Sequence, residues 1–364
     1  MSFTLPNRYK SNSIKLLLIL SIFLLISVVI YAKKKLKEKQ YVYQPIIMKN
    51  EKASNLNNDD KSSPTIFCLI KTHPGNLKTI KPFVSYRIWA RKCDNYRFTT
   101  LLPEHLRGPN YTNSETIEAY DKFYMIQPKG LKKEHHDTLT IKMYNSMIYV
   151  YEKFPKYDWY YITDDDAYLN VKNLKEFLRD KSWNESITYG YNFKVHIKDG
   201  FHGGGPGFVI SYAALETIVK AMQINIKNCP DTGVDDLDIN HCIRNYNGKI
   251  GKSIDEKGRE RFLGFSVDVH FSGNYPDWTE SYAQNPPRGG LDCCSDQLIA
   301  AHQRNAKDIF RIDFAMEMNQ RISLMYKKYF NIDKKVTFKN IIKSFVLLGD
   351  LDLDTNEFKD LIKF

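Results

Sequence analysis

Three consecutive aspartates, Asp164, Asp165 and Asp166, follow the apolar run DWYYIT. Side chains alternate between the two faces of an extended backbone, so Asp164 and Asp166 share one face and Asp165 takes the other. Such a carboxylate pair suits a hard divalent cation, which can neutralise a diphosphate leaving group. A solvated acidic loop, or charges that complement a helix N-terminus, is the plainer interpretation. The buried strand just ahead favours the metal site.

A second acidic cluster lies in DTGVDDLDINHC, where Asp235, Asp236 and Asp238 enter a predicted helix. One of these carboxylates can act as a general base that takes a proton from an acceptor hydroxyl. Acidic residues in a first helical turn are also common partners of the helix dipole. The spacing alone leaves both interpretations open.

The run GGGPG at 203–207 includes Gly204 and Gly205. Glycine lets the main chain approach a ligand closely, as a sugar ring packed against backbone requires. A tight turn without a ligand explains the run equally well.

A loop further along the chain carries Trp278 and Tyr282, whose rings suit stacking on the apolar face of a sugar. A loop that only covers the core is the alternative. The pair Cys293-Cys294 follows and constrains the approach to His302, either as a strained ring or through separate partners. His302 is a candidate third metal ligand, although a lone histidine is more often structural.

These residues lie on alternating strand-like and helix-like stretches that predict an α/β fold with a mixed sheet flanked by helices. The aspartates fall at the carboxyl end of a strand, where open α/β sheets bind their ligands. We predict strands at 65–71, 97–102 and 158–163, and helices near 76–92, 134–154, 171–180 and 306–329. The second half opens with the runs ITYGYNF and GGGPGFVIS. The last 35 residues are expected to be a peripheral extension.

The N-terminal run from Ile14 to Ile30 is apolar apart from Lys15 and two serines, and as a helix it reaches about 25 Å. A cleaved signal peptide is the rival interpretation, but lysines crowd the exit and no small-x-small site follows. We therefore expect a tail at 1–13, a transmembrane signal anchor at 14–32 and a flexible stem at 33–64, ahead of a catalytic domain at 65–330 and an extension at 331–364.

The orientation of this anchor is contested within the sequence. Lysines outnumber acids on both flanks, and by the positive-inside rule alone the N-terminus would face out. Six cysteines without a CxxC pair, and sequons at Asn110 and Asn184, instead favour a luminal, disulfide-bonded domain. The conflict stays open.

The formal net charge is +11, of which residues 1–40 carry +7. The basicity is therefore mostly a membrane flank, and it does not indicate a nucleic-acid partner.

Several motifs in order resemble the core 1 β1,3-galactosyltransferase family, within glycosyltransferase family thirty-one. The resemblance covers about residues 65–330 and rests on IFCLIKTHPGNLK with WARKC, DWYYITDDDAYLNVKNLKEFL, GGGPGFVIS, VDDLDINHC, and PPRGGLDCCSD followed by His302. It implies a GT-A-type, Rossmann-like fold, a type II anchor in the Golgi membrane, UDP-galactose as donor, Mn²⁺ as cofactor and inversion at the anomeric carbon. The implied acceptor is the 3-hydroxyl of O-linked GalNAc on Ser or Thr of a glycoprotein, and a homodimer is possible.

The same resemblance implies roles for individual residues. It places the metal on Asp164, Asp166 and His302, the base at Asp236 with Asp235 beside it, and the nucleotide near Thr72, Asn76 and Asp165. The acceptor would lie against Gly204, Gly205, Trp278 and Tyr282. The implied disulfides are Cys68–Cys93, Cys229–Cys242 and Cys293–Cys294.

The chain departs from the family most in the acceptor loop, where Glu280 and Ser281 stand among the aromatic residues. A β1,3-glycosyltransferase with another acceptor is therefore the first alternative. A non-catalytic, chaperone-like luminal relative is the second, and the intact DDD motif with His302 counts against it.

Overall fold

A computed structural model describes residues 63–108, 111–303 and 305–349. All of them lie within one compact unit, Lys61–Phe364. The predicted tail, anchor and stem lie outside the described residues, apart from the last residues before the domain, and so does Asn110. Along the described part of the chain, no helix combines the length and apolar character that crossing a membrane requires. Asn184 is exposed between a helix and a strand.

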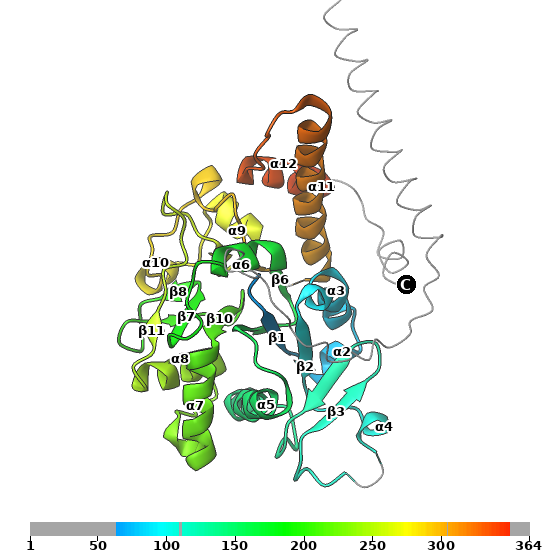
Figure 1. The fold of residues 1–364 in the computed structure, drawn as a ribbon, viewed down its shortest axis with the longest axis vertical. Helices are drawn as coiled ribbons and strands as arrows, with labels where there is room; N and C mark the ends of the chain where they lie inside the picture. Colours follow the sequence, from blue (N-terminus) through cyan, green and yellow to red (C-terminus); the bar gives the residue numbers. More distant parts are fainter. Residues whose placement is uncertain (1–62, 109–110, 304, 350–364) are drawn as a thin grey trace, which may run out of the picture. The chain divides into compact units, whose positions relative to one another are not determined.

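The central element is a mixed sheet of eight strands in the order β11-β7-β10-β5-β1-β2-β4-β3 (Figure 1). Strands β10 and β3 run antiparallel to their neighbours, and the other pairings are parallel. The bounds are β1 Ile66–Lys71, β2 Asn95–Thr99, β3 Ile117–Tyr120, β4 Tyr124–Gln127, β5 Trp159–Asp164, β7 Ile187–Gly190, β10 Phe208–Ser211 and β11 Lys249–Ile250.

Helices cover both faces of this sheet, which confirms the predicted mixed α/β fold (Figure 1). On one face β1 contributes Phe67 and Leu69 to a core shared with three helices, α5 Leu139–Lys153, α7 Tyr212–Ile224 and α8 Asp235–Asn245. On the other face Ile66 and Ile70 join a larger core. The helices of that core are α3 Lys81–Ile88, α6 Val171–Leu178, α9 Val267–Ser272, α11 Ala306–Phe330 and α12 Phe338–Gly349.

Two small sheets complete the framework. Strands β12 Phe262–Leu263, β13 Ala300–His302 and β6 Ala167–Leu169 form one, and β8 Asn192–Phe193 pairs with β9 Phe201–His202 in the other. The short helices α2 Pro74–Leu77, α4 Glu104–Arg107 and α10 Thr279–Tyr282 lie in connections. Short 3₁₀ turns occur at Ala90–Lys92, His136–Thr138, Ile226–Asn228 and Gly290–Asp292.

Local sequence explains where several elements begin. The side chain of Asn170 accepts a hydrogen bond from the N–H of Asn173, so α6 starts directly after the aspartate turn, as the sequence predicts. Helix α5 begins at Leu139, later than the predicted 134, because His136–Thr138 forms a 3₁₀ turn first.

The expected C-terminal extension contains a helix that belongs to the main core. Phe338, Ile341 and Phe345 of α12 are fully or almost fully buried, and Asn319 of α11 donates to the Asn340 carbonyl. Residues 331–349 therefore pack as part of the domain.

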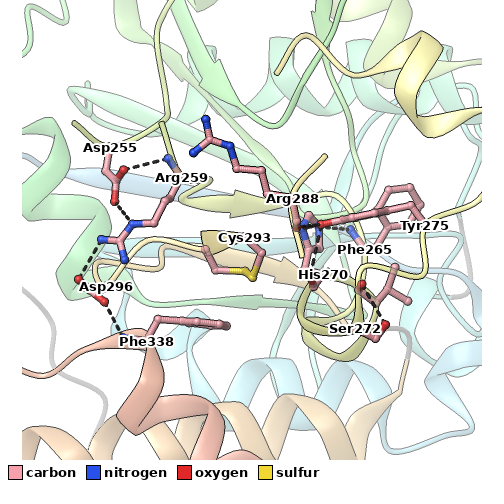
Figure 2. The surroundings of a disulfide bond; sticks show 12 residues. Asp255, Arg259, Phe265, His270, Ser272, Tyr275, Arg288, Cys293, Asp296 and Phe338 are labelled. Atoms are coloured by element: carbon pink, nitrogen blue, oxygen red, sulfur yellow. Dashed lines mark hydrogen bonds and ion pairs between the residues drawn. A yellow bond between two sulfur atoms is a disulfide. The ribbon is translucent and has the colours of Figure 1, made fainter. Parts of the chain in front are cut away.

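The structure pairs the cysteines as the resemblance implies, Cys68–Cys93, Cys229–Cys242 and Cys293–Cys294. The first joins β1 to the turn after α3, and the second joins α8 to the loop before it. Figure 2 shows Cys293 between the Asp255–Arg259–Asp296 group and the side chains of Tyr275 and His270.

Candidate active site

The candidate site lies at the edge of the sheet where β1 and β5 end. Lys71 and Asp164 are the last residues of these neighbouring parallel strands and lie opposite each other in the pairing register. The sheet therefore fixes a lysine beside the first aspartate of the DDD motif.

Lys71 lies between the two acidic clusters that the sequence singles out. Its Nζ is 3.0 Å from Asp164 Oδ1 and 2.7 Å from Asp235 Oδ2. Burial alone would lower the pKa of Lys71, but the charges of Asp164, Asp235 and Asp236 together raise that pKa above its ordinary value. The side chain is only 7% exposed, so its ammonium group is held in its charged form by these carboxylates.

Asp165 faces the other way, as the alternation of an extended chain requires. It accepts hydrogen bonds from Thr72 Oγ1 at 2.5 Å and from Asn76 Nδ2 at 2.9 Å. Burial raises the pKa of Asp165 to about 6, although these two hydrogen bonds oppose the shift. The three predicted nucleotide-binding residues thus contact one another, and Asp165 ties the turn after β1 to the turn after β5.

Asp166 contacts the predicted third metal ligand. His302 ends β13, which pairs with β6, and its Nε2 is 3.4 Å from Asp166 Oδ1. Lys81 Nζ lies 3.5 Å from Asp166 Oδ2. Burial alone would raise the pKa of Asp166, but His302 and then Lys81 outweigh it, so the pKa falls below its ordinary value. The carboxylate therefore stays ionised.

The glycine turn, residues 203–207, lies against the candidate base Asp236 and the candidate metal ligand His302. The N–H of Gly204 donates to Asp236 Oδ2 at 2.7 Å, and a Cβ on Gly204 would lie 3.2 Å from the Asp236 Cβ. A Cβ on Gly205 would lie 2.5 Å from His302 Nδ1. At Gly205 a Cβ would force His302 to shift, and at Gly204 it would be a tight contact, because the main chain passes directly against the candidate base and the candidate ligand.

Asp236 is partly exposed and is set apart from its neighbour Asp235, which is buried against Lys71. Burial and then the charge of Asp235 raise the pKa of Asp236 above its ordinary value. A carboxylate whose pKa is raised toward neutrality is a better proton acceptor, so Asp236 has the electrostatics of a general base.

The donor set fits a hard or borderline divalent cation, with carboxylate oxygens from Asp164 and Asp166 and an imidazole nitrogen from His302. Within residues 63–108, 111–303 and 305–349, no three acidic, His or Cys side chains already converge in a metal-holding arrangement. Lysine ammonium groups contact both carboxylates instead. Asp164 and Asp235 pair with Lys71 and Asp166 pairs with Lys81, whereas Asp236 forms no ion pair with either lysine in the described structure.

The predicted acceptor residues are Trp278, just ahead of α10, and Tyr282, the last residue of α10. Their ring centroids are 5.2 Å apart. Phe193 of β8 packs against both rings, at 6.1 Å from Trp278 and 6.4 Å from Tyr282. Trp278 is 44% exposed, so one large aromatic face stays open to a ligand. Through β8 and β9 this cluster is connected to the glycine turn.

Sequence reasoning missed three residues around the site. Lys71 ends a strand whose other residues are apolar, and Phe193 ends the run ITYGYNF, in which no residue type indicates a ligand site. Lys142 is buried in α5, where its Nζ donates to the Thr72 carbonyl at 2.7 Å and contacts Glu134. A lysine at the end of an apolar strand is unusual and could have drawn attention to Lys71. Its partners, Asp164 and Asp235, lie 93 and 164 positions away in the chain, so the sequence did not indicate them.

Comparison with known proteins agrees with this geometry. The model of the galactosyltransferase family matches residues 131–199, which include the DDD motif. Glycoprotein-N-acetylgalactosamine 3-beta-galactosyltransferase 1 of Xenopus laevis is 28% identical over 254 residues, which are 68% of this chain and 65% of the frog protein. Residues 131–199 are therefore similar to the galactosyltransferase family, and the chain spans just under two thirds of the length of the frog protein.

Other relatives and structural neighbours are more distant. Human chondroitin sulfate synthase 3 is 25% identical over 134 residues, which are 32% of this chain and 15% of the synthase. The galactosyltransferase LgtC, solved with donor and acceptor sugar analogues, is 13% identical with a TM-score of 0.34 over 66% of this chain and 87% of that one. A glycosyltransferase involved in the glycosylation of the major capsid of PBCV-1 is 17% identical with a TM-score of 0.28. The match covers 45% of this chain and 69% of that one.

Proposed function

We propose that this chain is a metal-dependent, inverting GT-A-type transferase that moves galactose from UDP-galactose to the 3-hydroxyl of O-linked GalNAc on glycoproteins. One observation carries the proposal: the carboxylates of Asp164 and Asp166, the imidazole of His302 and a partly exposed carboxylate, Asp236, lie at the ligand-binding edge of the sheet, where the glycine turn contacts both Asp236 and His302. The relationship to the frog transferase supports the choice of donor and acceptor.

In this proposal Asp164, Asp166 and His302 hold Mn²⁺, which supplies positive charge to the diphosphate of the donor. Asp236 Oδ2 or Oδ1 takes the proton of the acceptor 3-hydroxyl as the acceptor oxygen bonds to the anomeric carbon. The bond from that carbon to the diphosphate oxygen breaks at the same time, and UDP leaves with the bonding electrons. Attack from the face opposite UDP inverts the configuration at the anomeric carbon.

Other residues of the site position these groups. The Gly204 N–H orients Asp236, and Lys71 fixes Asp235 against the end of β1. Asp165 binds Thr72 and Asn76, so it sets the turn on which we propose the nucleotide lies. We further propose the setting that the sequence predicts, a luminal domain behind a type II signal anchor in the Golgi membrane.

A transfer assay tests the function directly. The full-length protein is incubated with UDP-galactose and a GalNAc-bearing peptide, with Mn²⁺ and with EDTA, and the product linkage is determined. Formation of Galβ1-3GalNAc only with the metal is the expected result. Metal-dependent hydrolysis of UDP-galactose without that product would support the proposed donor and contradict the proposed acceptor. No turnover and no UDP binding would support the non-catalytic alternative.

A further inference from the structure

A groove of about 350 Å³ opens beside the candidate site, on the β7 and β11 side of the sheet. Resting on the proposed function, we propose that this groove binds the polypeptide that carries the acceptor sugar. Its lining combines the ends of β7 and β11 with the loop that follows Tyr282, and the argument uses Asn192, Asp199, Lys252, Ser253, Gln284 and Asn285.

The groove is close to the candidate base. Asn192, in its lining, pairs with His202 across β8 and β9, and the N–H of Gly203 donates to the carbonyl of Tyr191. Gly204 is the next residue and donates to Asp236. Two residues of extended chain span about 7 Å, so a sugar at Asp236 and a peptide in the groove can belong to one acceptor.

The aromatic cluster is joined to the strand that lines the groove. The Gln284 N–H donates to the Asn192 carbonyl, and the Lys194 N–H donates to the Tyr282 carbonyl, so the acceptor loop is bonded along β8. Along this hydrogen-bonded loop, Trp278 and Tyr282 therefore come before the groove residue Gln284. A sugar stacked on the aromatic rings would leave its aglycone directed along the groove.

The lining has the chemistry of a site for an extended peptide rather than for a phosphate. Strand β11 is at the edge of the sheet, and in the described structure the N–H and C=O of Lys252, which follows it, have no backbone partner. An exposed strand edge of this kind can pair with an added strand. Amide side chains at Asn192, Gln284 and Asn285 can both donate and accept, as peptide groups require.

Charge agrees with this assignment. The lining carries one acid, Asp199, and one base, Lys252, so the groove has little net charge and offers no cluster of cations for an anion.

The test compares two acceptors that share the sugar and differ in the peptide. Full-length wild type and the variant Lys252→Ala/Gln284→Ala are assayed with a GalNAc-bearing dodecapeptide and with GalNAc linked to a benzyl group. Both substituted side chains are exposed, so the fold should be retained. We expect the KM for the glycopeptide to rise about tenfold and the KM for the benzyl glycoside to stay within about twofold.

A second variant, Lys252→Pro, removes the backbone N–H that Lys252→Ala keeps, and it should weaken the glycopeptide further if the peptide adds as a strand. Lys172→Ala, an exposed lysine on α6, is the matched control and should change neither KM. Equal effects on both acceptors, or no effect on the glycopeptide, would overturn the assignment of the groove.

Direct binding keeps this inference separate from the proposed function. Fluorescence anisotropy of the labelled glycopeptide measures affinity without transfer. Loss of affinity in the double variant supports the groove even if wild type transfers no galactose, a result that would remove only the proposed reaction. Unchanged affinity in the variant would remove the groove even if transfer is observed.

Discussion

Two networks of buried charge in this domain each have two carboxylates for every cation, but they differ in how the carboxylates are stabilised. At the sheet edge four carboxylates interact with two lysines, and the pKa of Asp164 is raised, first by burial, despite its contact with Lys71. Around the Cys293–Cys294 disulfide, Asp255 and Asp296 share Arg259, at 2.9 Å each, and Asp296 also accepts from the Phe338 N–H at 2.6 Å (Figure 2).

In the second network each carboxylate is satisfied. Burial alone would raise the pKa of Asp255 and of Asp296, but hydrogen bonds from Arg259 and from backbone groups outweigh it and lower both values. This network ties α12 to the disulfide loop. The comparison teaches that the ratio of acids to cations does not mark the functional region, because it is two to one in both networks. What differs is the direction of the pKa shift, which is upward for Asp164 and Asp236 and downward for Asp255 and Asp296.

The largest expected effect separates the two regions by activity. Asp236→Asn keeps the size of the side chain but removes the proton acceptor, so kcat should fall by about 10²- to 10⁴-fold with little change in Tm. Initial rates of transfer with saturating UDP-galactose, together with thermal unfolding, check this. The matched control is Asp255→Asn, which should lower Tm and leave kcat of the folded protein unchanged. An Asp236→Asn protein with full turnover would contradict the assignment of the base.

The next effect is on stability in the second network. Arg259→Met leaves the carboxylates of Asp255 and Asp296 without their shared cation, and the free energy of unfolding should fall by about 3 to 5 kcal/mol. Urea denaturation followed by fluorescence measures it.

Arg321→Met is the control, because Arg321 and Glu317 form an exposed pair on α11. Its effect should be below about 0.5 kcal/mol. If Arg259→Met were as mild as this control, the network would not hold α12 in place.

The third prediction concerns pH. Burial raises the pKa of Glu260 to about 7, against the opposing effect of Asn285, and its Oε2 has no hydrogen-bond partner within the described residues. An unfolded glutamate has a pKa near 4.3, so between about pH 4.3 and 7 the folded state binds more protons than the unfolded state. Stability is therefore greatest below this window and is lost as the pH rises through it.

The contribution of Glu260 to this loss is at most about 3.7 kcal/mol. Glu260→Gln should remove it, so the variant and wild type should converge at about pH 4 and differ at pH 7.5 in urea denaturation. Glu256→Gln, at an exposed glutamate, should leave the pH dependence as it is. A wild-type slope that persists in Glu260→Gln would assign the titration to another group.

Local sequence predicted the strands at 66–71 and 159–164 and the helices α6 and α11 within a few residues, because each has a clear apolar pattern or an N-cap. It also placed Asp164 and Asp166 on the face opposite Asp165. The features that local sequence did not predict depend on contacts between residues that are far apart in the chain. Lys71 meets Asp235 over 164 positions, and α12 enters the core through α11, so neither follows from spacing within one segment.

The smallest effect tests the contact between Lys71 and Asp164. Lys71 Nζ lies 3.0 Å from Asp164 Oδ1, so its ammonium competes with a divalent cation for this carboxylate. Charges of one and two units about 5 Å apart repel by about 1.7 kcal/mol even at the dielectric constant of water, so Lys71→Met should bind Mn²⁺ at least about tenfold more tightly. The electron paramagnetic resonance signal of free Mn²⁺ measures this affinity without turnover.

Lys92→Met, at a lysine paired with Asp313 and Glu317 away from the motif, should leave Mn²⁺ affinity unchanged. Because Lys71→Met also leaves Asp235 buried without a cation, Lys71→Met/Asp235→Asn serves as a second variant that keeps the local charge balance. Weaker Mn²⁺ binding in both variants would mean that the ammonium group organises the ligands and does not compete with the metal. The sheet edge would then resemble the Arg259 network, in which a fixed cation completes the carboxylates, and the distinction between the two regions would fail.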